Sequence, residues 1–459
     1  MKLLLASLLL LFSITPLPAA VQVREFKTAR GGRVWIYKPD AKADAKLPCV
    51  LVAAAGSNFI TGVSLGKEDR AEHQPYADAG FVVAAYDVSG ATAEGESDEA
   101  KLVEAIKAYS KSDFGMEDAM AALVVAKEKV PQIDPRRIYA AGHSSAGTLA
   151  LQLAASHGEI RGVAAYAPVV DLEGHIGTET IDRINASVMF YKRIGRWSPK
   201  NYPDLFRVPM FLFHAKDDEK PWVEAIESFH QSLENAKVPH EYVTAESGGH
   251  YDSMIKTGLP KGVAWLKKLD AGIAAAPKAA AGSKPLAVSP DLKIEFQDDG
   301  IHLGDFTFLA GKTTRSELIA TLGEPDRSLL DLAFQTGLLY YDAAGLVFQY
   351  KIGELKGSLP RPESPLDLNI YLKASEGSGP AKVFPGKVLI RGVEIRAGIT
   401  RSKVAADLGP KFTKEEAAIG DTFTSIRRFA KSYTNFYGGK LGSTEDAPVD
   451  SIACARPMP

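Results

Sequence analysis

One serine in this chain stands in the sequence context of a nucleophile. The hexapeptide Gly142–Gly147 reads GHSSAG, follows the apolar run 137–141 and precedes the helix-like segment 148–154. This order predicts a buried strand, a sharp turn and a helix, with the hydroxyl of Ser144 exposed above a sheet. A serine hydroxyl attacks an acyl carbon only when a base takes its proton, so the chain should also supply a histidine and an acid.

Both partners follow the serine, in the order acid and then histidine. The apolar run 209–215 leads to Asp217 and Asp218, and the run 241–245 leads to a loop of two glycines and His250. Each residue can therefore lie at the carboxyl end of its own strand. Asp218 is the expected acid that orients His250, the expected general base, while Asp217 stays open as the acid or as a helix cap.

The oxyanion that forms during acyl transfer needs two backbone N–H donors. One should be the amide of Ser145, directly after the nucleophile. The other should come from the loop after the apolar run 50–55, where Gly56 is the expected donor.

These three pieces resemble the α/β-hydrolase superfamily, in its dienelactone-hydrolase-like and prolyl-oligopeptidase-like branches. The resemblance rests on GHSSAG at 142–147, HAKDD at 214–218 and GGH at 248–250, and it covers residues 21–270. It implies a serine hydrolase with a Ser144–Asp218–His250 triad, because the family pattern H-G-x-x-D ends at Asp218. Two departures stand out: Ala146 replaces a usual glycine, and Ala54-Ala55 replace the usual His-Gly of the oxyanion loop.

Three functions follow from this pattern and stay open. The first is hydrolysis of carboxylic esters through an acyl-enzyme on Ser144. The second is a serine peptidase acting on short peptides, since the family resemblance includes both activities. The third is a non-catalytic envelope binding protein on a hydrolase scaffold, for which the altered oxyanion loop leaves room.

The other histidines predict neither a metal nor a cofactor. His143 and His214 are expected to pack or to form hydrogen bonds beside the strands, and the remaining six show no metal-ligand spacing such as H-E-x-x-H. No dinucleotide or phosphate-loop glycine pattern is present in the sequence.

Length and charge limit the classes further. The chain has 459 residues, enough for two or three domains, and 54 basic residues balance 56 acidic ones. This balance gives no indication of nucleic-acid binding. The expected substrate partner is a small ester or peptide.

The first 20 residues have the pattern of a secretory signal peptide. Lys2 precedes the apolar run 3–12, and small residues end the segment, with cleavage expected near Ala19 or Ala20. The protein is then secreted or periplasmic, the alternative being a retained anchor, and no later segment is apolar enough to span a membrane. An oxidising compartment permits a Cys49–Cys454 bridge, although two free thiols are favoured.

Residues 21–270 alternate strand and helix patterns, which predicts a mostly parallel sheet flanked by helices. Strands are expected at 34–37, 49–53, 81–86, 137–141, 162–166, 210–213 and 241–244, and helices include 116–130 and 222–233. The segment 171–206 is longer than an ordinary connection, so it is either a small cap over the serine or a packed surface excursion.

An Ala/Pro-rich linker at 271–289 separates this domain from a C-terminal α+β module at 290–459. The module contains a two-fold internal repeat, in which Thr-Arg-Ser recurs at 314 and 400 and Leu-Gly recurs at 322 and 408. A hairpin is expected at 338–348. The repeat resembles small α+β repeats of periplasmic outer-membrane-assembly and inhibitor-type binding proteins. That resemblance implies a protein-binding role, the alternative being a stabilising appendage.

Overall fold

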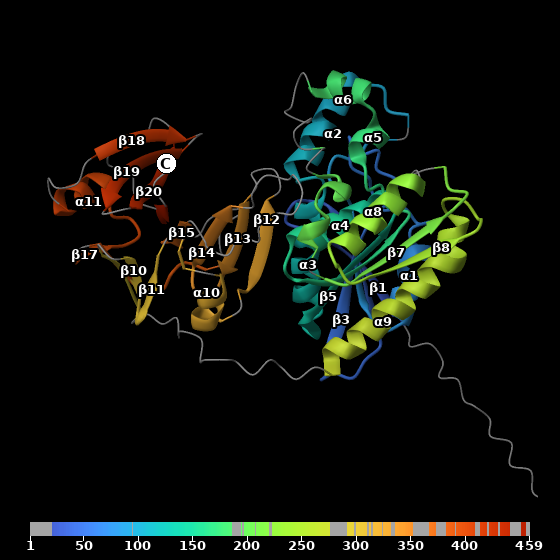
Figure 1. Cartoon of the computed structure of the whole chain (residues 1–459), viewed down its shortest axis with the longest axis horizontal. Coiled ribbons are helices and arrows are strands. Elements are labelled where there is room, and N and C mark those ends of the chain that lie inside the picture. Colours follow the sequence, from blue (N-terminus) through green and yellow to red (C-terminus); the bar gives the residue numbers. More distant parts are fainter. Residues whose placement is uncertain are drawn as a thin grey trace, which may run out of the picture.

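A computed structural model describes residues 21–275, apart from 94, 186–193, 195–196, 207 and 220–222, and helices, strands and short joining segments between 292 and 455. The N-terminal part is built on one eight-stranded sheet of order β1-β2-β4-β3-β5-β6-β7-β8 (Figure 1). Strands β3 to β8 run parallel, and β1 and β2 are antiparallel to their neighbours. The predicted mostly parallel sheet is confirmed.

The strands of this sheet contain the predicted apolar runs. They are β1 (Val21–Lys27), β2 (Arg33–Pro39), β3 (Leu47–Ala53), β4 (Val82–Tyr86), β5 (Ile133–His143), β6 (Ile160–Tyr166), β7 (Met210–Ala215) and β8 (His240–Ala245). The central strands are buried along nearly their whole length, as is typical of parallel strands covered on both faces. Only β1 was not expected, because its residues are mostly exposed and show no apolar run.

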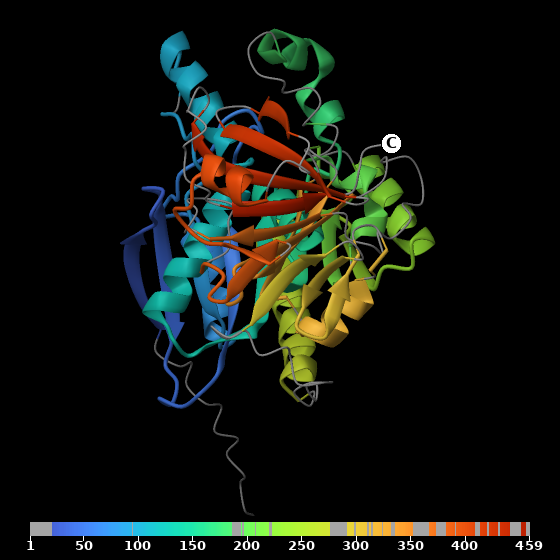
Figure 2. The same ribbon diagram turned by 90° about the vertical axis from the view of Figure 1, so that its left-hand side faces the viewer.

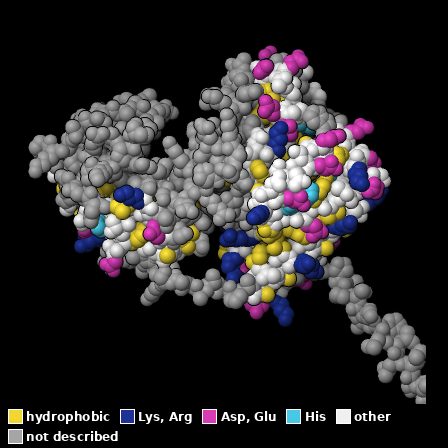
Figure 3. All heavy atoms as spheres, viewed as in Figure 1, with side chains coloured by type: hydrophobic (Ala, Val, Ile, Leu, Met, Phe, Trp, Pro, Cys, Tyr) yellow, Lys and Arg dark blue, Asp and Glu magenta, His cyan; other side chains and the backbone are white. Residues whose placement is uncertain are grey.

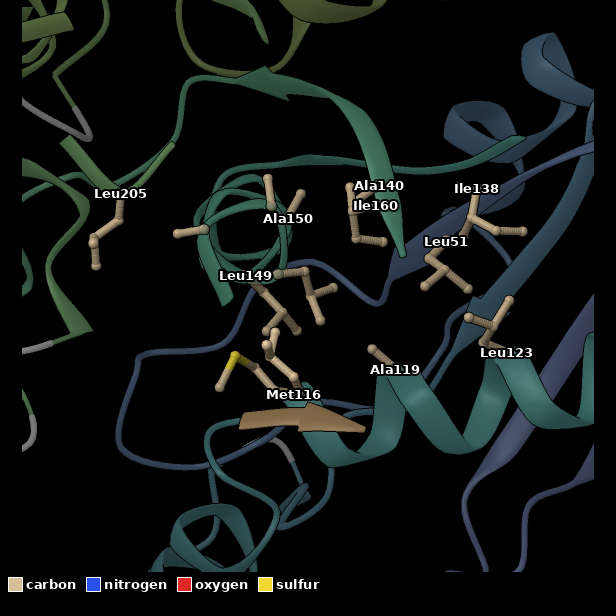
Figure 4. Close-up of a cluster of buried hydrophobic side chains, with 14 of the residues drawn as sticks. Leu51, Met116, Ala119, Leu123, Ile138, Ala140, Leu149, Ala150, Ile160 and Leu205 are labelled. Carbon is tan, nitrogen blue, oxygen red and sulfur yellow. The ribbon is translucent and has the colours of Figure 1, made fainter. Parts of the chain in front are cut away.

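Helices cover both faces of the sheet. On one face lie α3 (Met116–Lys129), α4 (Ser145–Ser156) and α8 (Val223–Asn235), and on the other lie α1 (Arg70–Asp78) and α9 (Leu259–Ala275). Alternation along a strand separates the two cores: Leu51 of β3 faces α3 and α4, whereas Val50 faces the core that includes α1 and α9 residues. Figure 4 shows Leu149 of α4 and Met116 of α3 in the first core, near the strand side chains. The serine-bearing helix is thus anchored by apolar packing.

Two helical excursions leave the carboxyl ends of strands. Helix α2 (Glu99–Lys111) follows β4, and the short helices α5 (Leu172–Ile176) and α6 (Thr178–Asn185) follow β6. Both excursions project beyond the same end of the sheet (Figures 1 and 2). The second belongs to the predicted segment 171–206, part of which, including Met189–Tyr191 and Arg193, lies outside the described residues.

The chain after residue 292 forms two further sheets. A five-stranded sheet has the order β11-β10-β9-β16-β17, and an eight-stranded antiparallel sheet has the order β12-β13-β14-β15-β21-β20-β19-β18. The predicted hairpin is confirmed, because β13 and β14 pair with Tyr341 opposite Leu346. The remaining element bounds are these: β9 (Lys293–Gln297), β10 (Gly300–Leu303), β11 (Phe306–Phe308), α10 (Arg315–Leu322), β12 (Arg327–Asp331), β13 (Thr336–Tyr341), β14 (Leu346–Lys351), β15 (Asp367–Tyr371), β16 (Lys387–Ile390), β17 (Val393–Ile395), α11 (Arg401–Leu408), β18 (Lys414–Ile419), β19 (Thr422–Phe429), β20 (Ser432–Lys440) and β21 (Ser451–Ala455).

Strand β12 meets the N-terminal sheet structure at the turn after α4. The amide of Gly158 donates to the carbonyl of Ser328 at 2.9 Å, and His157 forms an isolated bridge with Leu329. A Cβ on Gly158 would lie 1.9 Å from the hydroxyl oxygen of Ser328, so a larger residue here would make the Ser328 side chain rotate away.

The described surface carries both signs of charge, and the described helices are short or polar. On the face seen in Figure 3, acidic and basic side chains are interspersed over the N-terminal part. Within the described residues, no helix combines the length and apolar character needed to cross a bilayer.

Candidate active site

The predicted nucleophile Ser144 lies in the turn between β5 and α4. Its backbone has φ 53° and ψ −121°, a left-handed conformation that is strained for a residue with a side chain. The amide of Ser144 donates to the carbonyl of Tyr166 at 2.8 Å, and its carbonyl accepts from Thr148 at 3.0 Å. These bonds hold the strained residue from both sides.

Small residues let the turn close. A Cβ on Gly142 would lie 2.5 Å from the carbonyl carbon of Ala146, and a Cβ on Gly147 would lie 2.8 Å from the carbonyl oxygen of Gly142. Ala146 itself is buried in the core. Alanine is therefore accommodated at this position because Gly142 opposite it has no side chain.

The acid and the histidine meet at the carboxyl ends of β7 and β8. Nδ1 of His250 lies 2.8 Å from Oδ2 of Asp218, whose side chain is buried, whereas about a third (32%) of the His250 side chain is exposed. A carboxylate at Nδ1 leaves Nε2 as the ring nitrogen that can take a proton from a hydroxyl. The fully buried ring of His214 packs beside them, with its Nε2 3.8 Å from Oδ2 of Asp218.

Asp217 binds a different part of the same loop. Its carboxylate accepts the amides of Gly248 and Gly249 at 3.0 and 2.9 Å. These two hydrogen bonds lower the pKa of Asp217, the bond from Gly249 being the larger cause. Asp217 therefore braces the histidine loop, while Asp218 contacts the ring.

The loop after β3 lies against the start of α4. The amides of Gly56 and Ser57 both donate to the hydroxyl oxygen of Ser145, each at 3.0 Å. Gly56 adopts φ 97°, which favours glycine. The sequence predicted backbone roles for Gly56 and Ser145 but not this side-chain contact, which joins the two elements expected to donate to an oxyanion.

His143 and Glu72 also lie at this site. The ring of His143 packs against the ring of His250 in a tilted arrangement with centroids 4.5 Å apart, and its Nε2 lies 3.0 Å from the carbonyl oxygen of His250. A carboxylate oxygen of Glu72 lies 3.6 Å from Nδ1 of His143. Sequence analysis assigned His143 to packing or hydrogen bonding and missed Glu72, which lies 71 residues earlier on α1.

The described parts of the segment 171–206 pack near the loop after β3 and against the core. The ring of Phe59 makes an edge contact with His175 of α5, 5.5 Å between centroids. Trp197 is 1% exposed and packs on Phe114, and its carbonyl accepts from Gln152 at 2.9 Å. The part of the segment 171–206 around Trp197 is therefore packed into the core. At Trp197 this fits a packed excursion better than a cap over the serine.

The described part of the chain contains possible metal ligands and a buried cysteine. Among the residues that the structure describes, no three His, Cys, Asp or Glu side chains could together hold a metal ion. Cys49 is a free, buried thiol in β3.

One family of known proteins matches the part of the chain that carries this site. Residues 68–270 match the model of the prolyl oligopeptidase family. No curated protein matches the chain.

Several solved structures are similar to part of the chain. An acylaminoacyl peptidase from Pyrococcus horikoshii is 15% identical with a TM-score of 0.44, covering 54% of this chain and 40% of its own. A puromycin hydrolase is 23% identical with a TM-score of 0.44, over 57% of this chain and 40% of its own. A sugar hydrolase from Lactococcus lactis is 16% identical with a TM-score of 0.43, over 55% of this chain and 100% of its own.

This chain thus spans less than half the length of the peptidase and of puromycin hydrolase. Residues 68–270, which include strands β4 to β8 and the strained serine turn, are thus similar to the prolyl oligopeptidase family.

Proposed function

We propose that this protein is a secreted serine hydrolase that cleaves carboxylic esters through Ser144, His250 and Asp218. The observation that carries the proposal is the 2.8 Å contact between Nδ1 of His250 and buried Asp218, because it prepares Nε2 of the ring as a base. The ring contact of His250 with His143, the residue before Ser144, brings base and nucleophile to the same edge of the sheet.

The reaction proceeds in two halves. The hydroxyl oxygen of Ser144 attacks the acyl carbon while its proton passes to Nε2 of His250. The alcohol then leaves with that proton, which gives an acyl-enzyme. Water, deprotonated by His250, attacks the acyl carbon and releases the acid and free Ser144. The carboxylate of Asp218 stabilises the imidazolium in both halves. This sequence needs no cofactor.

The oxyanion is assigned to the amides of Ser145 and Gly56. Ser145 begins α4, where backbone N–H groups have no partner within the helix. The N–H of Gly56 donates to the hydroxyl of Ser145, so an oxyanion would share this donor with that hydroxyl.

A peptidase acting on short peptides is the second candidate. It is favoured by the match of residues 68–270 to a family described as prolyl oligopeptidases. Serine hydrolysis of an amide uses the same triad, and the difference lies in the protonation of an amine leaving group by His250.

Hydrolysis of p-nitrophenyl esters and of aminoacyl p-nitroanilides by the protein without residues 1–20 tests both candidates. Wild type and Ser144→Ala are compared, each also exposed to a fluorophosphonate probe. Ester turnover and labelling that disappear together in the variant support the proposal, and faster anilide cleavage selects the peptidase. A folded wild type that neither turns over nor is labelled would favour the non-catalytic binding protein.

The remaining sequence-based expectations belong to the same proposal. We place a signal peptide at 1–20, which lies outside the described residues, a hydrolase domain at 21–270, a linker at 271–289 and a repeat module at 290–459. Support for the repeat comes from α10 and α11, which are both eight residues long and both run from Arg to Leu. We assign this module to binding a protein partner. N-terminal sequencing of the exported protein and limited proteolysis near 271–289 test the boundaries.

A further inference from the structure

We propose that His143 is a positioning residue for the base His250. The inference rests on the proposed function, in which His250 is the base. It extends that function to a buried side chain that the triad does not include.

His143 contacts His250 in two ways. A carbonyl oxygen can only accept, so Nε2 of His143 donates to the carbonyl of His250 across 3.0 Å. The two rings also pack against each other, tilted by 42° with centroids 4.5 Å apart. One contact holds the backbone of His250 and the other holds one face of its ring, so together they limit both translation and rotation.

Glu72 lies near the other nitrogen of the same ring. Its carboxylate oxygen lies 3.6 Å from Nδ1 of His143, and both side chains are buried, at 8% and 5% exposure. This separation is longer than a hydrogen bond, so the carboxylate attracts the imidazole only when the ring carries both protons. Glu72 belongs to α1, and α1 packs on β2 and β4.

The loop that carries His250 needs such support. Gly248 and Gly249 both adopt left-handed conformations, with φ 116° and 58°. Asp217 binds the amides of these glycines, and the amide of Ser253 donates to the carbonyl of Gly248 at 3.0 Å. His143 adds a contact to the backbone carbonyl of His250 itself.

Because His143 directly precedes Ser144, the same short segment sets the position of the nucleophile and of the base. A displacement of about 1 Å between reacting groups can cost about 10²-fold in rate. The arrangement thus links the serine turn to the histidine loop without passing through Asp218.

Gln and Asn at position 143 form a matched pair of variants. The amide nitrogen of Gln reaches the position of Nε2, whereas that of Asn reaches only the position of Nδ1, and both remove the ring–ring contact. We expect His143→Gln to keep most of the wild-type kcat, and His143→Asn to lower kcat by about 10²-fold with KM nearly unchanged. Hydrogen exchange of amides 248–252 should be faster in the Asn variant than in the Gln variant.

His73→Gln is the control, because His73 is a buried histidine next to Glu72 on α1 whose ring contacts Trp35 and Tyr37. It should change stability and leave kcat at the wild-type value. Equal kcat and equal exchange in the Gln and Asn variants, or a loss that appears only in KM, would overturn the positioning role. Absence of wild-type turnover would instead refute the proposed function, while the exchange comparison would still decide whether His143 orders the loop.

Discussion

Asp217 and Asp218 are neighbours in the chain, yet they hold two different parts of one loop. Asp218 lies 2.8 Å from the ring of His250, whereas Asp217 accepts the backbone amides of the two glycines before that histidine. The sequence left the choice between these acids open. Geometry separates them, because only the carboxylate of Asp218 faces Nδ1.

Replacing each acid by its amide should therefore have unequal effects. Asp218→Asn can donate to Nδ1 and so favours the wrong tautomer of His250, and kcat should fall by about 10⁴-fold. Asp217→Asn keeps one acceptor oxygen for the glycine amides, so its loss of kcat should be much smaller. Steady-state kinetics on a p-nitrophenyl ester, with circular dichroism to verify folding, measure both. Equal losses in the two variants would contradict this assignment.

The hydroxyl of Ser145 provides a second test of the site. Ser145→Ala leaves the amides of Gly56 and Ser57 without their acceptor, which should lower the free energy of unfolding by about 1–3 kcal/mol. The kcat should fall by less than the about 10²–10³-fold cost of removing an oxyanion donor, because both backbone amides remain.

Ser156→Ala is the matched control for this variant. Ser156 is a buried serine at the other end of α4, and its hydroxyl donates to the carbonyl of Gln152. Urea denaturation should show destabilisation in both variants, and kcat should fall only in Ser145→Ala. A Ser145→Ala enzyme with wild-type kcat would show that the hydroxyl does not hold the oxyanion loop.

The sequence predicted those parts of the site that depend on local order. Ser144, Asp218 and His250 each follow an apolar run, and such runs form the buried parallel strands β5, β7 and β8. Strand β1 could not be predicted in this way, because it lies at the sheet edge, where pairing with β2 replaces burial as the main stabilisation.

Contacts between distant segments were beyond sequence reasoning. Glu72 reaches His143 because α1 packs over the sheet, and Gly56 reaches Ser145 across 89 positions. No local pattern encodes these distances, since they depend on how helices and loops pack. The buried state of His143 and Glu72 becomes visible only in the folded chain.

The thiol of Cys49 should be unreactive in the folded protein. Burial raises its pKa to about 12, so almost no thiolate is present near neutral pH. In a Cys454→Ser background, we expect Ellman's reagent at pH 8 to react with less than a tenth of an equivalent, roughly, until denaturant is added. Rapid reaction of one full equivalent under native conditions would show that β3 opens or that Cys49 is accessible.

Buried His73 should make the protein less stable in mild acid. Desolvation lowers its pKa from 6.5 to about 3, so between these values the unfolded chain binds a proton that the folded chain does not. The free energy of unfolding is therefore unaffected by this group above about pH 6.5. Below that value it falls with the pH, by up to about 1.4 kcal/mol per pH unit.

Urea denaturation between pH 7 and pH 4.5 measures this slope. His73→Gln removes the titrating group, so its stability should fall less steeply over the same range. Parallel curves for the variant and the wild type would mean that His73 takes up its proton without unfolding the protein.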